Sequence, residues 1–311
     1  MIKNDRPRRS VLYMPGANTR ALEKGRTLAA DCLILDLEDS VSADSKVQAR
    51  QNILEAIARG GYGHRELIIR INALSSPWGY DDLAAASTSG ADAVLLPKVE
   101  SADTVRQADL VMNTAGAPPE MAIWAMMETP IGTLKVEEIS ASSPRLTCLV
   151  MGTSDLAKDL HASHTRDRMP MITSLGMCLL AARAYNLAIL DGVHLDLRDD
   201  EGLAYSCRQG LDMGFDGKTL IHPRTIGIAN EVFSPSPEEV EWSRKIIDAH
   251  AAAMAEGKGV AVYEGKLVEN LHVENAHRIV AMAAAIEQRA RDEREAEAAE
   301  AAAEPQRAEA S

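Results

Sequence analysis

The sequence predicts an α/β fold, a (β/α)₈ barrel of the TIM type with a C-terminal helical lid extension. Three observations support this prediction. Short apolar runs of strand length recur eight times, longer amphipathic stretches separate them, and together they occupy about 230 residues. A chain of 311 residues has room for such a barrel and for an appended segment.

The eight apolar runs are the expected strands. None of them alternates strictly between polar and apolar residues, which is typical of parallel strands buried on both faces. In chain order, the runs are Ser10–Met14, Cys32–Leu37, Leu67–Ile71, Ala93–Leu96, Met121–Met127, Leu146–Met151, Leu187–Leu190 and Gly217–Ile221. Because the first βα turn lacks a G-x-G-x-x-G motif, an open doubly wound sheet is the less favoured alternative.

The stretches between the runs predict helices. Asn18–Ala30, Lys46–Arg59 and Ala102–Met112 are examples whose apolar residues recur with helical spacing. Since strands that alternate with helices pair in parallel, these stretches predict successive βα units.

Three parts of the chain are expected. They are a barrel domain in residues 1–235, a lid or helical extension in residues 236–285, and an Ala/Glu-rich tail in residues 286–311. Ser236 followed by Pro237 predicts the cap and first residue of a helix, and Val260–Tyr263 predicts an extended piece before a further helix. The tail has little to bury, so a frayed helix or disorder is expected there.

Composition excludes several classes of partner. The net charge of −13 disfavours binding to nucleic acid or to an anionic membrane surface, and no apolar run reaches the ~18 residues of a membrane span. The four cysteines have no CxxC spacing and are expected to be reduced thiols. The first residues contain no apolar stretch typical of a secretion signal, so we expect a cytoplasmic protein.

Ionisable residues follow almost every expected strand. In a TIM-type barrel, the carboxyl ends of the strands form the active face. The residues there include Asp36, Glu38, Asp39, Arg70, Lys98, Glu128, Asp155, Asp191 and His222. Several carboxylates in one cavity repel one another unless a cation lies between them, and an oxygen-rich set favours Mg²⁺, with Mn²⁺ as an alternative. A single acid after a strand is usually a turn former or helix cap, as expected for Asp44 and Asp159.

Eight segments at this rim occur in a recognisable order. They are Arg9–Gly16, Leu35–Val41, Arg70–Asn72, Val94–Lys98, Glu128–Gly132, Gly152–Leu156, Ala188–Val193 and Lys218–Pro223. Together they resemble the citrate lyase β-like and malyl-CoA lyase family of CoA-ester lyases, in the HpcH/HpaI aldolase superfamily. The resemblance covers about residues 9–285.

The resemblance implies roles for five rim residues. Glu128 and Asp155 match the two Mg²⁺ ligands of the family. Arg70 matches the arginine that binds the oxo-acid oxygen, and Glu38 and Asp39 match acids near the metal shell. We therefore expect Arg70 and Asp39 to be catalytic and Glu38 to contact substrate.

The resemblance also implies a lid. Family members form trimers or hexamers in which a C-terminal lid closes over the site of a neighbouring subunit. The lid typically carries an aspartate where this chain has Glu269, at the end of Gly265–Glu269. Glu269 is therefore the candidate acid/base, one methylene longer than the usual residue.

The substrate is expected to be a CoA ester, with coenzyme A as part of it. Further candidates for binding it are Pro15, Gly16, Lys24, Met126 and Pro130. Met14 and Trp78 are expected beside Met126 and Pro130 in the pocket for the acyl group.

The expected reaction is reversible carbon–carbon cleavage. A 3-hydroxy-dicarboxylyl-CoA such as malyl-CoA, β-methylmalyl-CoA or citramalyl-CoA would give an oxo-acid, glyoxylate or pyruvate, and an acyl-CoA. Two alternatives stay open. One is a (3S)-malyl-CoA thioesterase that uses the same metal site, which the longer Glu269 favours. The other is a non-catalytic β-type subunit of a citrate lyase-like complex.

Overall fold

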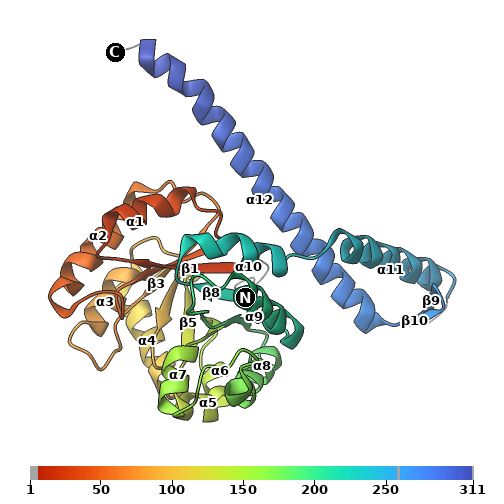
Figure 1. Cartoon of the computed structure of the whole chain (residues 1–311), viewed down its shortest axis with the longest axis horizontal. Coiled ribbons are helices and arrows are strands. Elements are labelled where there is room, and N and C mark those ends of the chain that lie inside the picture. Colours follow the sequence, from red (N-terminus) through yellow and green to blue (C-terminus); the bar gives the residue numbers. More distant parts are fainter. Residues whose placement is uncertain (1–5, 258–259, 310–311) are drawn as a thin grey trace. The chain divides into compact units, whose positions relative to one another are not determined.

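Eight parallel strands close into a barrel in the computed structural model, which describes residues 6–257 and 260–309 (Figure 1). The strands are β1 (Ser10–Pro15), β2 (Cys32–Asp36), β3 (Glu66–Arg70), β4 (Ala93–Leu96), β5 (Ala122–Met127), β6 (Leu146–Met151), β7 (Ala188–Asp191) and β8 (Gly217–Leu220). Each strand pairs with the next, and β8 returns to β1 with Lys218 opposite Ser10. The predicted barrel is confirmed, and every strand end lies within one residue of its predicted position.

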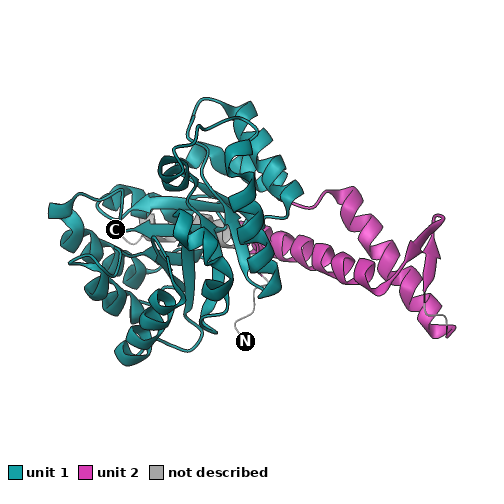
Figure 2. Cartoon of the chain, turned by 90° about the horizontal axis from the view of Figure 1, so that it is seen from below, with its two compact units in different colours: residues 1–4, 8–233 teal, residues 5–7, 234–311 magenta. Residues whose placement is uncertain are grey.

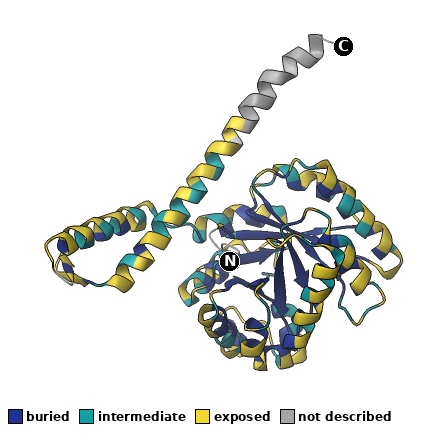
Figure 3. Ribbon diagram, turned by 180° about the vertical axis from the view of Figure 1, so that it is seen from behind, coloured by how far each residue is buried: buried dark blue, intermediate teal, exposed yellow. Residues whose placement is uncertain are grey.

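Side-chain alternation along the strands separates two apolar layers. Val11 and Tyr13 of β1 belong to the cluster inside the barrel, whereas Leu12 and Met14 belong to the cluster between strands and helices. Figure 3 shows the barrel strands in the colour of buried residues over nearly all of their length. The expectation that Met14 lines the acyl pocket is therefore wrong, because successive residues of a strand point to opposite faces.

Helices follow the strands around the barrel. They are α1 (Thr19–Lys24), α2 (Lys46–Arg59), α3 (Gly79–Ser87), α4 (Ala102–Ala115), α5 (Pro130–Leu134), α6 (Val136–Ser140), α7 (Thr153–Asp159), α8 (Ile172–Ala184), α9 (Asp200–Met213) and α10 (Ile226–Val232). Short 3₁₀ turns are η1 (Gly25–Thr27), η2 (Ala43–Ser45), η3 (Met169–Met171) and η4 (Pro223–Thr225).

The first helix is shorter than the predicted Asn18–Ala30. Asn18 caps it as expected for its residue type, since its side chain accepts a hydrogen bond from the Ala21 N–H. At Gly25 the chain tightens into η1, and Leu28 is already extended. A Cβ at Gly25 would lie 3.1 Å from Leu33 Cδ1, so the glycine lets this turn approach the barrel closely.

A second compact unit begins at Ser234 (Figure 2). It contains α11 (Pro237–Ala255), a hairpin of β9 (Ala261–Tyr263) and β10 (Lys266–Val268), and α12 (Asn270–Glu309). Ser236 and Glu239 form the reciprocal capping box that starts α11. The tail, for which the sequence left a frayed helix or disorder open, is helical as far as Glu309. In the described ranges of the chain, no helix is both long and apolar enough to cross a membrane.

Candidate active site

A cavity of ≈ 330 Å³ lies at the carboxyl ends of the barrel strands. Its ionisable lining residues are Asp36, Asp39, Arg70, Glu128 and Asp155; its other polar ones include Ser40, Thr153, Ser154 and Thr219; and its apolar ones include Tyr13, Met126, Met151, Val193, Leu195 and Ile221. The cavity therefore combines several carboxylates with apolar lining residues, which is the composition of a small-molecule site.

Arg70 is fixed by Asp36 at one side of the cavity. Its Nε and Nη2 donate to the two carboxylate oxygens of Asp36 at 2.6 and 2.8 Å, and both side chains are buried. Burial opposes ionisation of Asp36, but the hydrogen bonds from Arg70 outweigh it and hold the Asp36 pKa below its usual value. The guanidinium also lies over the Tyr13 ring, 4.8 Å from its centroid. Arg70 is thus a charged group with a set orientation.

The remaining guanidinium nitrogen of Arg70 is held more loosely. Nη1 lies 2.9 Å from Glu38 Oε2 without hydrogen-bond alignment, and it donates to Asp39 Oδ2 at 3.3 Å. Lys98 Nζ lies 3.6 Å from the other Glu38 oxygen. Burial and then the nearby Asp39 raise the Glu38 pKa, against the opposing effect of Arg70. Nη1 is therefore the donor of Arg70 that is most available to a ligand.

Glu128 directly follows β5 and is 1 % exposed. One oxygen, Oε1, accepts the backbone N–H of Lys98 at 2.8 Å. Burial, and next the charge of Glu38, raise the Glu128 pKa to about 7. The charge of Arg70 acts in the opposite direction but does not outweigh burial and the neighbouring acids.

Asp155 lies in the first turn of α7, which starts after β6 at Gly152. Its side chain is 28 % exposed, and Lys158 Nζ is 4.0 Å away. Strand β6 neighbours β5 in the barrel, with Met151 opposite Met127. This register brings the segments that carry Asp155 and Glu128 to the same side of the cavity.

The residues fit a divalent cation. The cavity and its rim hold Asp36, Glu38, Asp39, Glu128 and Asp155, against Arg70 and Lys98 as cations. Such an oxygen-rich excess of negative charge favours a hard ion such as Mg²⁺. Among the side chains that the structure describes, no three acids, histidines or cysteines form a ready-made metal cluster. Glu128 and Asp155 would therefore leave other positions of the ion to water and substrate, as Mg²⁺ sites commonly do.

The structure locates the other predicted binding residues. Met126 lines the cavity, whereas Pro15, Gly16, Lys24 and Pro130 are not among its lining residues. Gly16 donates its N–H to the Asp36 carbonyl at 2.9 Å, and a Cβ there would lie 2.8 Å from the same oxygen. Gly16 thus lets the β1–α1 turn lie close to β2.

Glu269 is a half-buried residue of the second unit. It immediately precedes α12, and its backbone N–H donates to His272 Nδ1 at 3.0 Å. That Glu269 contacts a substrate in the barrel cavity stays a prediction.

Sequence reasoning assigned no binding role to several lining residues. Asp36 ends the second expected strand, and its pairing with Arg70 follows from the register, in which the two residues lie opposite each other. Thr153 and Leu195 follow β6 and β7 and line the cavity as well. Their position after a strand indicates that they can line the site, but uncharged residues are common at such positions and cannot be distinguished there from residues without a binding role.

Comparisons with known proteins show which family the chain resembles in sequence and in fold. A family model described as HpcH/HpaI aldolase/citrate lyase matches residues 9–223. A (3S)-malyl-CoA thioesterase of Cereibacter sphaeroides is 52 % identical over 280 residues, covering 90 % of this chain and 96 % of that protein. An L-malyl-CoA/β-methylmalyl-CoA lyase of the same species is 35 % identical, covering 89 % and 95 %. The crystal structure of CitE from Mycobacterium tuberculosis with magnesium, acetoacetate and coenzyme A has a TM-score of 0.71 at 30 % identity, covering 88 % and 97 %.

Proposed function

The chain belongs to the HpcH/HpaI aldolase/citrate lyase family, and we propose that within it the chain hydrolyses the thioester of a malyl-CoA-type substrate. The observation that carries this proposal is the similarity to malyl-CoA thioesterases, at 52 % identity over nearly the whole length of both chains. The lyase relative is more distant, at 35 %. Hydrolysis is therefore better supported than the carbon–carbon cleavage first expected from the sequence.

The cavity suits the acyl part of such a substrate. Its volume of ≈ 330 Å³ exceeds that of a four-carbon dicarboxylate and leaves space for water. We infer that Arg70 Nη1 binds an oxygen of the acyl group, because it makes none of the short hydrogen bonds by which Nε and Nη2 hold Asp36. Asp36 keeps the guanidinium in place, so the charge needs no reorganisation when the substrate binds.

Glu128 and Asp155 are the proposed ligands of a Mg²⁺ ion. Bound there, the ion would supply positive charge for the carboxylate and the hydroxyl of the malyl group. The CitE structure contains magnesium together with coenzyme A, which supports the same pairing for this chain. Asp39, whose side chain is largely exposed at the rim, is proposed to act near this ion through water.

Hydrolysis joins a water oxygen to the thioester carbonyl carbon and breaks the carbon–sulfur bond. The products are a carboxylate and the free thiol of coenzyme A, and the water gives up its protons in the process. We propose Glu269 as the base that takes the first proton. The lid of a neighbouring subunit in a trimer or hexamer would bring it to the cavity, as the family resemblance implies.

Carbon–carbon cleavage is the second candidate. The lyase relative favours it, and Glu128 with Asp155 could hold the malyl group in either reaction. In cleavage, the 3-hydroxyl loses its proton to solvent, the bond between C2 and C3 breaks, and the hydroxyl oxygen becomes the oxo group of glyoxylate. The electron pair of the broken bond passes to the acetyl-CoA carbon, to which Glu269 gives a proton. The two reactions differ in whether free thiol appears.

A product assay tests the proposal. Purified full-length protein is incubated with (S)-malyl-CoA and Mg²⁺, with and without EDTA, and free thiol, malate and glyoxylate are measured separately. We expect free thiol and malate to form without glyoxylate, and we expect EDTA to prevent their formation. Glyoxylate without free thiol would replace hydrolysis by cleavage. Neither product with malyl-CoA, β-methylmalyl-CoA or citramalyl-CoA would overturn both candidates and favour a non-catalytic subunit.

A further inference from the structure

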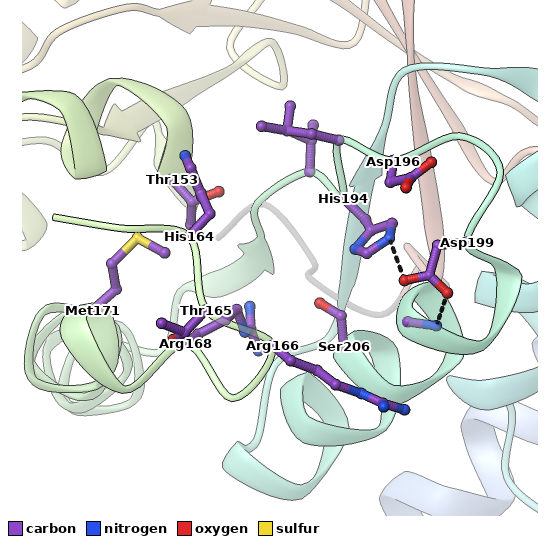
Figure 4. Close-up of a pocket in the computed structure, with 13 residues that line it drawn as sticks. Thr153, His164, Thr165, Arg166, Arg168, Met171, His194, Asp196, Asp199 and Ser206 are labelled. Atoms are coloured by element: carbon purple, nitrogen blue, oxygen red, sulfur yellow. Dashed lines mark hydrogen bonds and ion pairs between the residues drawn. The ribbon is translucent and has the colours of Figure 1, made fainter.

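A second cavity, of ≈ 340 Å³, lies beside the first one. Figure 4 shows the residues that line the second cavity. The two cavities share Thr153, Val193 and Leu195 as lining residues. The second is formed by the segment before η3, which carries His164–Arg168, and by the loop between β7 and α9. The proposed hydrolysis assigns no role to the charged and polar residues that line only the second cavity, so the function of this cavity is open.

A buried cluster with excess positive charge lies at the inner end of the second cavity. Asp191 is its central carboxylate and is completely buried. Arg168 Nη1 donates to both Asp191 oxygens at 2.6 and 2.7 Å, and Lys218 Nζ donates to Oδ2 at 2.8 Å. Two cations thus share one carboxylate. Lys218 also donates to Ser206 Oγ at 2.9 Å, and both Arg168 and Ser206 line the cavity.

Two nitrogen atoms at this end lack a hydrogen-bond partner. Arg168 is 8 % exposed, and its Nη2 is buried without an acceptor in the described part of the chain. His194 Nε2 is also buried and has no hydrogen-bond partner among the described residues, because Asp199 Oδ2 lies 3.8 Å away, beyond hydrogen-bond length. Buried polar atoms are usually hydrogen-bonded, so both nitrogen atoms can bond to a group from outside the protein, whether water or a ligand.

The titration of His194 agrees with a positive local potential. Burial lowers its pKa, and the charge of Lys218 lowers it further, against the opposing effect of Asp199. A neutral imidazole keeps one N–H, which Nε2 can offer to an acceptor.

The acids of the second cavity lie toward solvent. Asp196 and Asp199 are both exposed, and each already accepts a backbone N–H. Asp199 caps α9 through the Gly202 N–H, as the dashed line in Figure 4 shows. Their charges are therefore screened by water, whereas those of Arg168 and Lys218 are not.

We propose that the second cavity binds an anionic group, a carboxylate or a phosphate ester, between Arg168 Nη2 and His194 Nε2. Arg166 provides a further charge at the entrance: it is exposed, lies over the Tyr205 ring at 5.0 Å and lines the cavity. Such a group could belong to a CoA ester that extends from the first cavity, or to a separate small anion. Both sources present the same oxygens to the site.

Binding of inorganic phosphate tests the proposal without reference to turnover. Full-length protein is titrated by calorimetry in EDTA, so that a metal cannot recruit the anion. We expect one saturable site in the wild type. Arg166→Gln is expected to weaken binding about tenfold, since a positive charge at the entrance is lost. Arg198→Gln removes the same charge from the loop between β7 and α9, but Arg198 does not line the cavity, so its effect should be less than about twofold.

Arg168→Lys is the second variant, because it keeps the charge beside Asp191 and removes Nη2. If it does not fold, Ser206→Ala and Arg166→Gln still test the site. Equal affinity in the wild type, Arg166→Gln and Ser206→Ala, or no saturable binding by the wild type, would overturn the proposal. Repeating the titration with saturating coenzyme A separates the sources. If coenzyme A competes with phosphate, the site binds part of the CoA ester. If the affinity for phosphate is unchanged, the site binds a separate anion.

Discussion

The carboxylate of Glu128 occupies the space that a side chain at Gly152 would need. A Cβ at Gly152 would lie 2.5 Å from Glu128 Oε2, closer than real Cβ atoms come to other atoms. Gly152 immediately follows β6 and precedes α7, the helix that carries Asp155. The two proposed metal ligands therefore depend on the same glycine.

Gly152→Ala should displace Glu128. We expect metal-dependent turnover to fall about tenfold or more, and the free energy of unfolding to fall by about 1–3 kcal/mol, since buried overpacking is costly. Turnover and chemical denaturation measure the two effects. Gly176→Ala is the matched control, because no atom lies within 4 Å of the added Cβ and it lies within helix α8. Unchanged turnover in Gly152→Ala would show that Glu128 need not hold its position.

Glu128→Gln and Asp155→Asn should each remove Mg²⁺-dependent turnover while the barrel stays folded. We expect a loss of about 100-fold in rate, because the neutral amide is a poor ligand for a hard cation. Calorimetry with Mg²⁺ should show weaker binding in both. Asp159→Asn at the end of the same helix α7 is the control, since Asp159 does not line the cavity. Full activity in either ligand variant would refute the metal site.

Glu128 gives the metal-free protein a predicted pH dependence. Its pKa is about 7 in the folded state against 4.5 in the unfolded state, so the folded state holds the proton more tightly. The contribution of Glu128 to the free energy of unfolding is therefore fully present below pH 4.5 and is lost as the pH rises toward 7. The total loss is roughly 3 kcal/mol. Denaturation in EDTA from pH 5 to 8 should show this decline, and Glu128→Gln should flatten it. Mg²⁺ affinity should rise over the same interval, since the ion competes with the proton.

Asp36→Asn should destabilise the protein more than Asp39→Asn. Asp36 is buried and accepts two short hydrogen bonds from Arg70, whereas Asp39 is 59 % exposed and accepts one at 3.3 Å. Breaking a buried ion pair costs about 3–5 kcal/mol, and an exposed one contributes less than about 1 kcal/mol. Chemical denaturation of the two variants makes the comparison. Equal losses would mean that Arg70 is held by the whole acidic group instead of by Asp36.

Glu269→Gln tests the proposed base. We expect kcat to fall about 100-fold with little change in KM, because a general base acts in the transition state. Glu264→Gln in the same hairpin region is the control, since Glu264 is an exposed residue of the turn between β9 and β10. A kcat that is unchanged in Glu269→Gln would leave the residue without a catalytic role.

Much of the fold was predictable because its signals are local. The β4 run Ala93–Leu96 and the helix Lys46–Arg59 have their predicted bounds, since burial on both faces and helical spacing are both written in consecutive residues. Helix α1 departed from its prediction because the close approach of Gly25 to Leu33 involves a residue from the next strand. Strand β10 was not predicted, since its three residues make no pattern without their partner β9.

The sequence by itself determined the strand order and the residues that follow each strand, including Glu128 and Asp155. These follow from chain order, because parallel strands all end at one rim. Only the tertiary structure decided which charges meet there. The register of β2 and β3 sets Asp36 opposite Arg70, and the register of β7 and β8 sets Asp191 opposite Lys218. The closure of the barrel then places Lys218 opposite Ser10 of β1. Pairings between residues that are distant in the chain depend on register and closure, and no local pattern of residues records them.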